Sequence, residues 1–163
     1  MHYRTSRTLL ALVSGITLVY LAAVLVISLG LAFWVAVVDP VFLGLPSALA
    51  QPLIAGLAGV SGSTFRAIWS CADRIANGWE IGTLKLPDAA RPEKFHMRLV
   101  PGYVARPFLG AWVGLILYGG LKGGSLFLAA ERVELNPLAL VFVSGVAGLF
   151  AKRFAESLAQ RVP

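Results

Sequence analysis

Five basic residues lie within apolar stretches or directly beside them, where they could bind an anion or a lipid headgroup. They are Arg66, Arg106, Lys122, Lys152 and Arg153. A charge inside a membrane span is costly and often marks a ligand site or an ion path. A long basic side chain near the end of a span can instead extend to the interface, where its charge contacts lipid phosphates. We expect this second arrangement, with the ion path as the alternative.

One histidine also stands at a spacing that is used in catalysis. Arg91 and His96 in RPEKFH have the spacing of a ribonuclease motif, in which histidine is the general base and arginine steadies the phosphate. Pro92 does not suit the helix interior that this motif occupies, and such short patterns arise by chance. We therefore expect His96 to be a loop residue near the interface and predict that the chain is not an enzyme.

Other site chemistries lack the residues they need. Cys71 is the only cysteine and the two histidines are His2 and His96, so the sequence predicts no disulfide, metal site or cofactor. We expect Cys71 to be a plain interfacial residue, with palmitoylation as the alternative. The predicted spans contain no internal carboxylate of the kind that ion-coupled transporters and cation filters use, which argues against both.

The composition is that of a small membrane protein. Of the 163 residues, 58% are hydrophobic and only 13% are charged, and the mean hydropathy is +0.78. A soluble domain has about 25% charged residues. The net charge of +6 sorts onto one side of the predicted bilayer, so we attribute it to topology and not to nucleic acid.

The apolar runs predict an all-α membrane protein with four transmembrane helices in a single domain (residues 1–163). Turn and capping signals separate the runs: Asp39-Pro40, Asn77-Gly78, Arg106-Pro107 and Asn136-Pro137. The predicted spans are residues 9–38, 52–76, 107–128 and 137–151.

Small residues recur along three of these spans and predict close helix packing. They are Gly56, Gly59 and Ser63, then Gly110 and Gly114, then Gly145 and Gly148. The span 107–128 also carries the pairs Gly119/Gly120 and Gly123/Gly124, so we expect it to be the helix around which the others are organised. Arg106 would then stand at a helix N-terminus, where a cation opposes the macrodipole and needs a lipid phosphate or a carboxylate such as Asp73.

Charge distribution predicts the orientation in the membrane. Four crossings place twelve lysines and arginines on the side of the termini and two, Lys122 and Arg132, on the other. Because cytoplasmic segments carry the excess of basic residues, both termini should be cytoplasmic. Residues 78–105 then form a cytoplasmic loop, and residues 152–163 form an amphipathic helical tail.

Three segments carry a family likeness: GSTFRAIWS, YVARPFLGAWVGLILYGGLKGG and NPLALVFVSGVAGLFAKRFAESL. In this order they resemble a pattern in uncharacterised bacterial multi-pass inner-membrane proteins, with an R-P-x-x-G helix followed by an N-P-opened helix ending in G-L-F. The resemblance covers roughly residues 61–160 and implies the same membrane architecture. It implies no catalytic residue.

Two functions follow as expectations. The first is a non-catalytic inner-membrane anchor or assembly subunit, which is oligomeric or bound to another membrane protein and contacts anionic lipid headgroups on the cytoplasmic side. The alternative is a homo-oligomeric channel or pore with Arg66 or Lys122 facing its lumen.

Overall fold

The computed structural model describes residues 7–38, 46–79, 94–127, 136–153 and 157, and these residues form an all-helical bundle. Its elements are α1 (Arg7–Val37), α2 (Ser47–Ala76), a short 3-10 helix η1 (Met97–Leu99), α3 (Val100–Phe127) and α4 (Pro137–Leu149). The expected all-α class is confirmed for this part of the chain, where the β structure amounts to one isolated bridge between Trp79 and Phe95.

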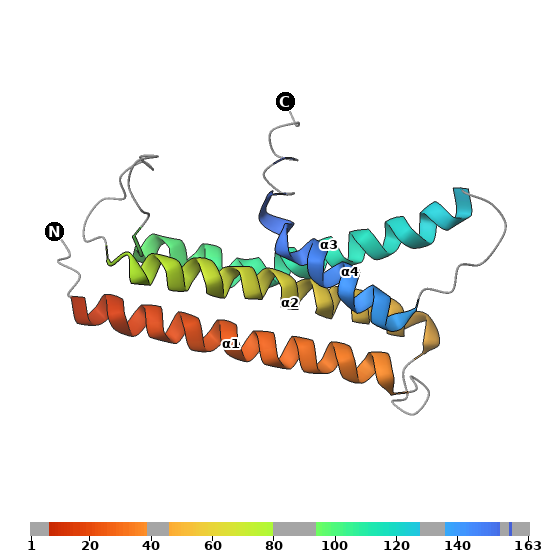
Figure 1. Cartoon of the computed structure of the whole chain (residues 1–163), viewed down its shortest axis with the longest axis horizontal. Helices are drawn as coiled ribbons and strands as arrows, with labels where there is room; N and C mark the ends of the chain where they lie inside the picture. The colour runs from red at the N-terminus through yellow and green to blue at the C-terminus, as the bar shows by residue number, and fades with distance from the viewer. Residues whose placement is uncertain (1–6, 39–45, 80–93, 128–135, 154–156, 158–163) are drawn as a thin grey trace.

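The other helices pack around α2, and not around the predicted span 107–128 as we expected. In Figure 1, α1 and α3 run antiparallel to α2 on either side of it, and α4 crosses it. Helix α2 can contact the other helices closely because small residues lie on several of its faces. Among them, Ala55, Ala58 and Ala67 are fully or almost fully buried. The far half of α3 extends away from the bundle, and a side-chain carbon on Gly119, Gly120 or Gly123 would meet nothing within 4 Å.

The contact between α1 and α2 combines apolar packing with a polar bond. Ala32 and Val35 of α1 pack in one cluster with Ala50 and Ile54 of α2, together with residues of α4. Between these helices, the hydroxyls of Ser28 and Ser61 form a buried hydrogen bond of 2.9 Å. Each hydroxyl also bonds a carbonyl of its own helix, that of Leu25 for Ser28 and that of Leu57 for Ser61, so the serine pair adds a satisfied polar contact to the interface.

Two prolines that we expected to open helices lie inside them. Helix α2 begins at Ser47 and contains Pro52, while α3 begins at Val100 and contains a buried Pro107. Arg106 is therefore an interior residue of α3, and the macrodipole argument for it was wrong. The start of α3 is set instead by η1, in which the His96 side chain accepts a hydrogen bond from the backbone N–H of Arg98 at 3.0 Å.

The segment just before α3 is packed into the bundle and not laid on its surface. Phe95 is fully buried, and its ring stacks on that of Tyr103 with centroids 6.4 Å apart. The backbone N–H of Phe95 also donates to the carbonyl of Gly78 at 3.0 Å. His96 is 7% exposed, so it is not the interfacial loop residue we expected. Residues 80–93, with Arg91, lie outside the described residues.

Helix α4 begins as the sequence predicts, with Pro137 in the first turn and the Asn136 side chain accepting from the N–H of Leu138 at 2.9 Å. It ends at Leu149, before the predicted 151, with Phe150 as its cap. Residues 151–153 are again helical. Most of the predicted tail, 152–163, lies outside the described residues.

Two helical stretches are long and apolar enough to cross a membrane: Arg7–Val37 and Met97–Gly123. Helix α4 is apolar but shorter. Only 22% and 17% of the most apolar windows of the two long stretches are buried inside the bundle. Most of their apolar side chains therefore face outward.

Candidate functional site

Glycine contacts fix how α2, α3 and α4 cross. A Cβ atom placed on Gly59 would overlap the carbonyl oxygen of Gly110 and lie 3.2 Å from the Cα of Gly114. A Cβ atom on Gly148 would overlap the carbonyl oxygen of Gly59 from the other side. Gly59 is thus the point where the three helix backbones touch, an arrangement that only residues without side chains permit.

The remaining small residues extend this contact along α2. A Cβ atom on Gly110 would overlap the Ser63 hydroxyl, and one on Gly114 would overlap the carbonyl oxygen of Ala55. Gly56 and Gly145 are packed more loosely, since a Cβ atom on either would be 3.7 Å or more from its neighbours. Gly62, which belongs to the same small-residue stripe of the sequence, is packed tightly against the Gly145 backbone.

These crossings bring distant basic residues to one place. Arg66 follows Ser63 by three residues on α2, and Arg106 precedes Gly110 by four residues on the antiparallel α3. Because Ser63 and Gly110 touch, the two arginines lie one turn beyond the contact on the same side. Helix α4 ends just after Gly148, and Lys152 and Arg153 beyond it lie beside the two arginines.

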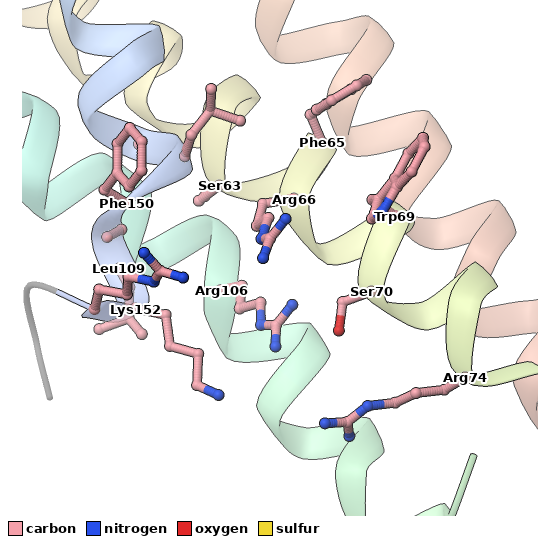
Figure 2. A pocket seen from close by; sticks show the side chains of 14 residues that line it. Ser63, Phe65, Arg66, Trp69, Ser70, Arg74, Arg106, Leu109, Phe150 and Lys152 are labelled. Carbon is pink, nitrogen blue, oxygen red and sulfur yellow. The ribbon is translucent and has the colours of Figure 1, made fainter. Parts of the chain in front are cut away.

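A pocket of about 700 Å³ lies where these residues meet. Figure 2 shows Arg66 and Arg74 from α2, Arg106 from α3 and Lys152 from the end of α4 around one hollow. Arg153 also lines it. The five basic side chains come from α2, α3 and the segment after α4. No described residue that lines the pocket is acidic.

Helical spacing builds the α2 wall of the pocket. Arg66, Ser70 and Arg74 follow one another at intervals of four residues, so they lie along one face of α2. Arg66 is exposed, and Arg74 is half-buried. With Arg106, Lys152 and Arg153 they give the lining a positive charge, so the pocket favours an anion.

Tyr103 holds the α3 wall in position. It is 1% exposed, and the guanidinium carbon of Arg106 lies 4.9 Å from the centre of its ring, within the range of a cation–π contact. Its hydroxyl donates to the carbonyl of Ser70 across the α2–α3 interface at 3.5 Å, and its ring stacks on Phe95. Arg106 therefore projects from a rigid part of the bundle.

The fifth predicted basic residue lies elsewhere. Lys122 is near the far end of α3, where its ammonium donates to the Gln51 side chain at 3.3 Å and lies 5.8 Å from the centre of the Tyr118 ring. Four of the five predicted residues thus share the pocket, and Lys122 does not.

Several residues of the site were absent from our sequence-predicted set, among them Arg74 and Ser70 in the pocket wall and Tyr103 beside it. The signals that could have found them are local. Arg74 follows Arg66 by two turns of a helix, and Tyr103 precedes Arg106 by three residues, a spacing at which helical side chains are neighbours. We assigned Arg74 to the wet end of the second helix and Tyr103 to a loop, so neither was considered with Arg66 or Arg106.

The chemistry available in this pocket is anion binding. Among the described residues there is no group of three or more His, Cys, Asp or Glu side chains that could hold a metal ion. Cys71, which we expected to be a plain interfacial residue, is fully buried in the bundle beside Phe95 and Tyr103. Guanidinium groups bind phosphate or carboxylate through paired hydrogen bonds, so the pocket is suited to such an anion. No protein-family model, curated protein or solved structure matches this chain.

Proposed function

We propose that this chain is a four-span protein of the bacterial inner membrane, with both termini in the cytoplasm, that acts as a non-catalytic anchor or assembly subunit. The observation that carries the proposal is the outward exposure of its most apolar helices, which are only 22% and 17% buried in those windows. The core helix of a soluble protein would be mostly buried. The bacterial inner membrane is the location that the resemblance noted for residues 61–160 would imply.

The orientation follows from where the basic residues lie. Nine lysines and arginines lie among the described residues. Arg7 opens α1, Arg74 is in the last turn of α2, and Lys94 and Arg98 stand just before α3; Figure 1 shows these three helix ends on the same side of the bundle. Arg66, Arg106, Lys152 and Arg153 line one pocket with Arg74. Lys122 instead contacts Gln51, near the start of α2 at the other side. The positive-inside rule assigns the side with the larger positive charge to the cytoplasm.

Two engineered cysteines test this orientation with matched chemistry. Lys152→Cys and Lys122→Cys each replace an exposed lysine, and the buried Cys71 of the unaltered chain provides an unlabelled background. In intact spheroplasts, a membrane-impermeant maleimide should label the residue 122 variant. It should label the residue 152 variant only after permeabilisation. The reverse pattern, or equal labelling of both, would contradict the proposed topology.

The role in assembly is supported by the far half of α3. The surface around Gly119, Gly120 and Gly123 is open in this chain, and glycines are the residues that let another transmembrane helix approach closely. The particle isolated in native lipid should therefore contain several copies of the chain or a second protein. A homogeneous monomer would be evidence against an assembly subunit.

The same open face leaves a homo-oligomeric pore as the second candidate. A closed ring of copies that conducts ions in planar bilayers, with an ion preference reversed by Arg66→Glu or Lys122→Glu, would establish it. Silence under voltage, pH and ligand variation would leave the anchor as the better account.

A further inference from the structure

We propose that the basic pocket binds the headgroup of an anionic phospholipid that carries more than one phosphate charge. The inference deepens the function proposed above and rests on it, because it requires this end of the bundle to lie at the cytoplasmic membrane surface. Three features support it: the number of basic residues in the pocket, the apolar residues in the same wall, and the origin of the basic residues from α2, α3 and the segment after α4.

The number of cations sets the charge of the ligand. A single phosphodiester carries one negative charge, whereas Arg66, Arg74, Arg106, Lys152 and Arg153 together carry five positive charges. Arg66, Arg74 and Arg106 line the same pocket, so one anion bound there would interact with all three. Two phosphates in one headgroup would match this set better than one, since arginine binds phosphate through a planar pair of donors.

The apolar residues in the pocket wall indicate which class of anion binds there. Phe65, Trp69 and Phe150 line the pocket, and they are 53%, 65% and 54% exposed. A small inorganic polyanion such as pyrophosphate has no apolar surface to place against these exposed aromatic side chains. A phospholipid would place its phosphates on the cations and its acyl chains along these residues, and tryptophan is enriched at this depth of a bilayer. Basic pockets between transmembrane helices on the cytoplasmic side have the chemistry to bind such headgroups.

The pocket is also placed to join three helices. Its basic residues come from α2, α3 and the segment after α4, which meet at the Gly59 crossing. A bound headgroup would hold the end of α4 against the other two helices. Any ligand that binds the folded chain and not the unfolded one raises the stability of the fold, so occupancy can be measured as a thermal shift.

The experiment uses the delipidated full-length chain in neutral detergent. Three probes are compared at equal phosphorus concentration: diphosphatidylglycerol, phosphatidylglycerol with the same acyl chains, and inorganic pyrophosphate. Diphosphatidylglycerol should raise the melting temperature most and should remain bound in native mass spectrometry. Equal shifts with phosphatidylglycerol would overturn the requirement for more than one charge. An equal shift with pyrophosphate would overturn the assignment to a lipid.

Variants locate the site. Arg66→Gln with Arg106→Gln should weaken diphosphatidylglycerol binding by about tenfold or more, the loss expected when charge-assisted hydrogen bonds are removed. Lys152→Gln with Arg153→Gln changes only exposed side chains at the end of α4, so it should weaken binding without preventing folding. The matched control is Arg7→Gln with Arg98→Gln, which removes the same charge from exposed positions that do not line the pocket. An equal loss in the control would show binding to general surface charge and would overturn the proposal.

The experiments distinguish a failure of the lipid-binding proposal from a failure of the proposed function. If the cysteines at 122 and 152 label as expected but no lipid preference is seen, the pocket assignment alone is wrong. If their labelling is reversed, the pocket lies at the other leaflet and the proposed function itself is wrong.

Discussion

At the scale of single residues, Gly59 stands where three helix backbones come into contact. It is the position where α2 meets the backbones of both α3 and α4, and the neighbouring atoms are main-chain atoms that cannot move aside separately. Interiors of this kind are close-packed, so an added methyl group forces the backbones apart.

We therefore expect Gly59→Ala to lower the free energy of unfolding by about 2 kcal/mol, within the usual range for overpacking. The matched control is Gly15→Ala in α1, where a Cβ atom would meet nothing within 4 Å. Alanine is the better helix former, so this control should be neutral or stabilising by up to about 1 kcal/mol. Denaturant titration in detergent micelles would measure both. Equal effects of the two substitutions would show that α2 does not make the close crossing.

At the scale of elements, the packing of residues 94–99 shows how a short segment sets the start of a long helix. Phe95 stacks on Tyr103, the fourth residue of α3, and His96 caps η1 immediately before this helix. Tyr103 in turn contacts Arg106 in the basic pocket. Packing of one buried ring therefore positions both the helix and a residue of the candidate site.

Removing that ring should release the segment. Phe95→Ala deletes a fully buried side chain, a change that typically costs about 3–5 kcal/mol and here acts first on a segment at the edge of the bundle. Trypsin cleavage after Lys94 and Arg98 should then become faster by about tenfold or more, because proteolysis follows the population of the open form. Met97→Ala, at a position that is 41% exposed, is the control and should leave the rate nearly unchanged. If both variants are cleaved at the wild-type rate, Phe95 does not hold the segment.

The helices themselves could be predicted from sequence, because long apolar runs and strong caps are local signals. The Asn136-Pro137 start of α4 is the clearest case, since the cap and the first-turn proline need only neighbouring residues. The start of α3 could not be predicted in the same way. It depends on Phe95 packing against Tyr103, a contact that no local pattern reports, and the proline at 107 pointed to a later start.

The sequence could predict which basic residues were candidates for the site, but not which of them come together in the fold. Arg66, Arg106, Lys152 and Arg153 were chosen because each charge stands beside apolar sequence, which is a local property. Their meeting depends on the register of three helices, which is set by the Gly59 and Ser63 contacts. Lys122 gave the same local signal and lies at the far end of α3, so the signal alone does not distinguish the two places.

At the scale of the whole molecule, the helices differ in length more than one flat bilayer can accommodate. With 31 residues, α1 is about 46 Å long, whereas α4, with 13 residues, is about 20 Å long. The hydrocarbon core of a bilayer is about 30 Å thick. In the proposed four-span arrangement, α1 can tilt, but α4 needs a locally thin membrane.

This mismatch predicts that the fold is most stable in thin bilayers. In nanodiscs of phosphatidylcholines with increasing acyl-chain length, the melting temperature should fall as the bilayer thickens, since each ångström of mismatch costs a fraction of a kcal/mol. The control inserts four apolar residues after Pro137, which lengthens α4 by about 6 Å while leaving Gly145 and Gly148 in register with α2. Because the longer helix matches a thicker core, this variant should reach its highest melting temperature in thicker bilayers than the unaltered chain. If both chains melt at the same temperature in every bilayer, α4 does not cross the membrane, and the four-span arrangement would have to be replaced by one in which the short helix lies at the surface.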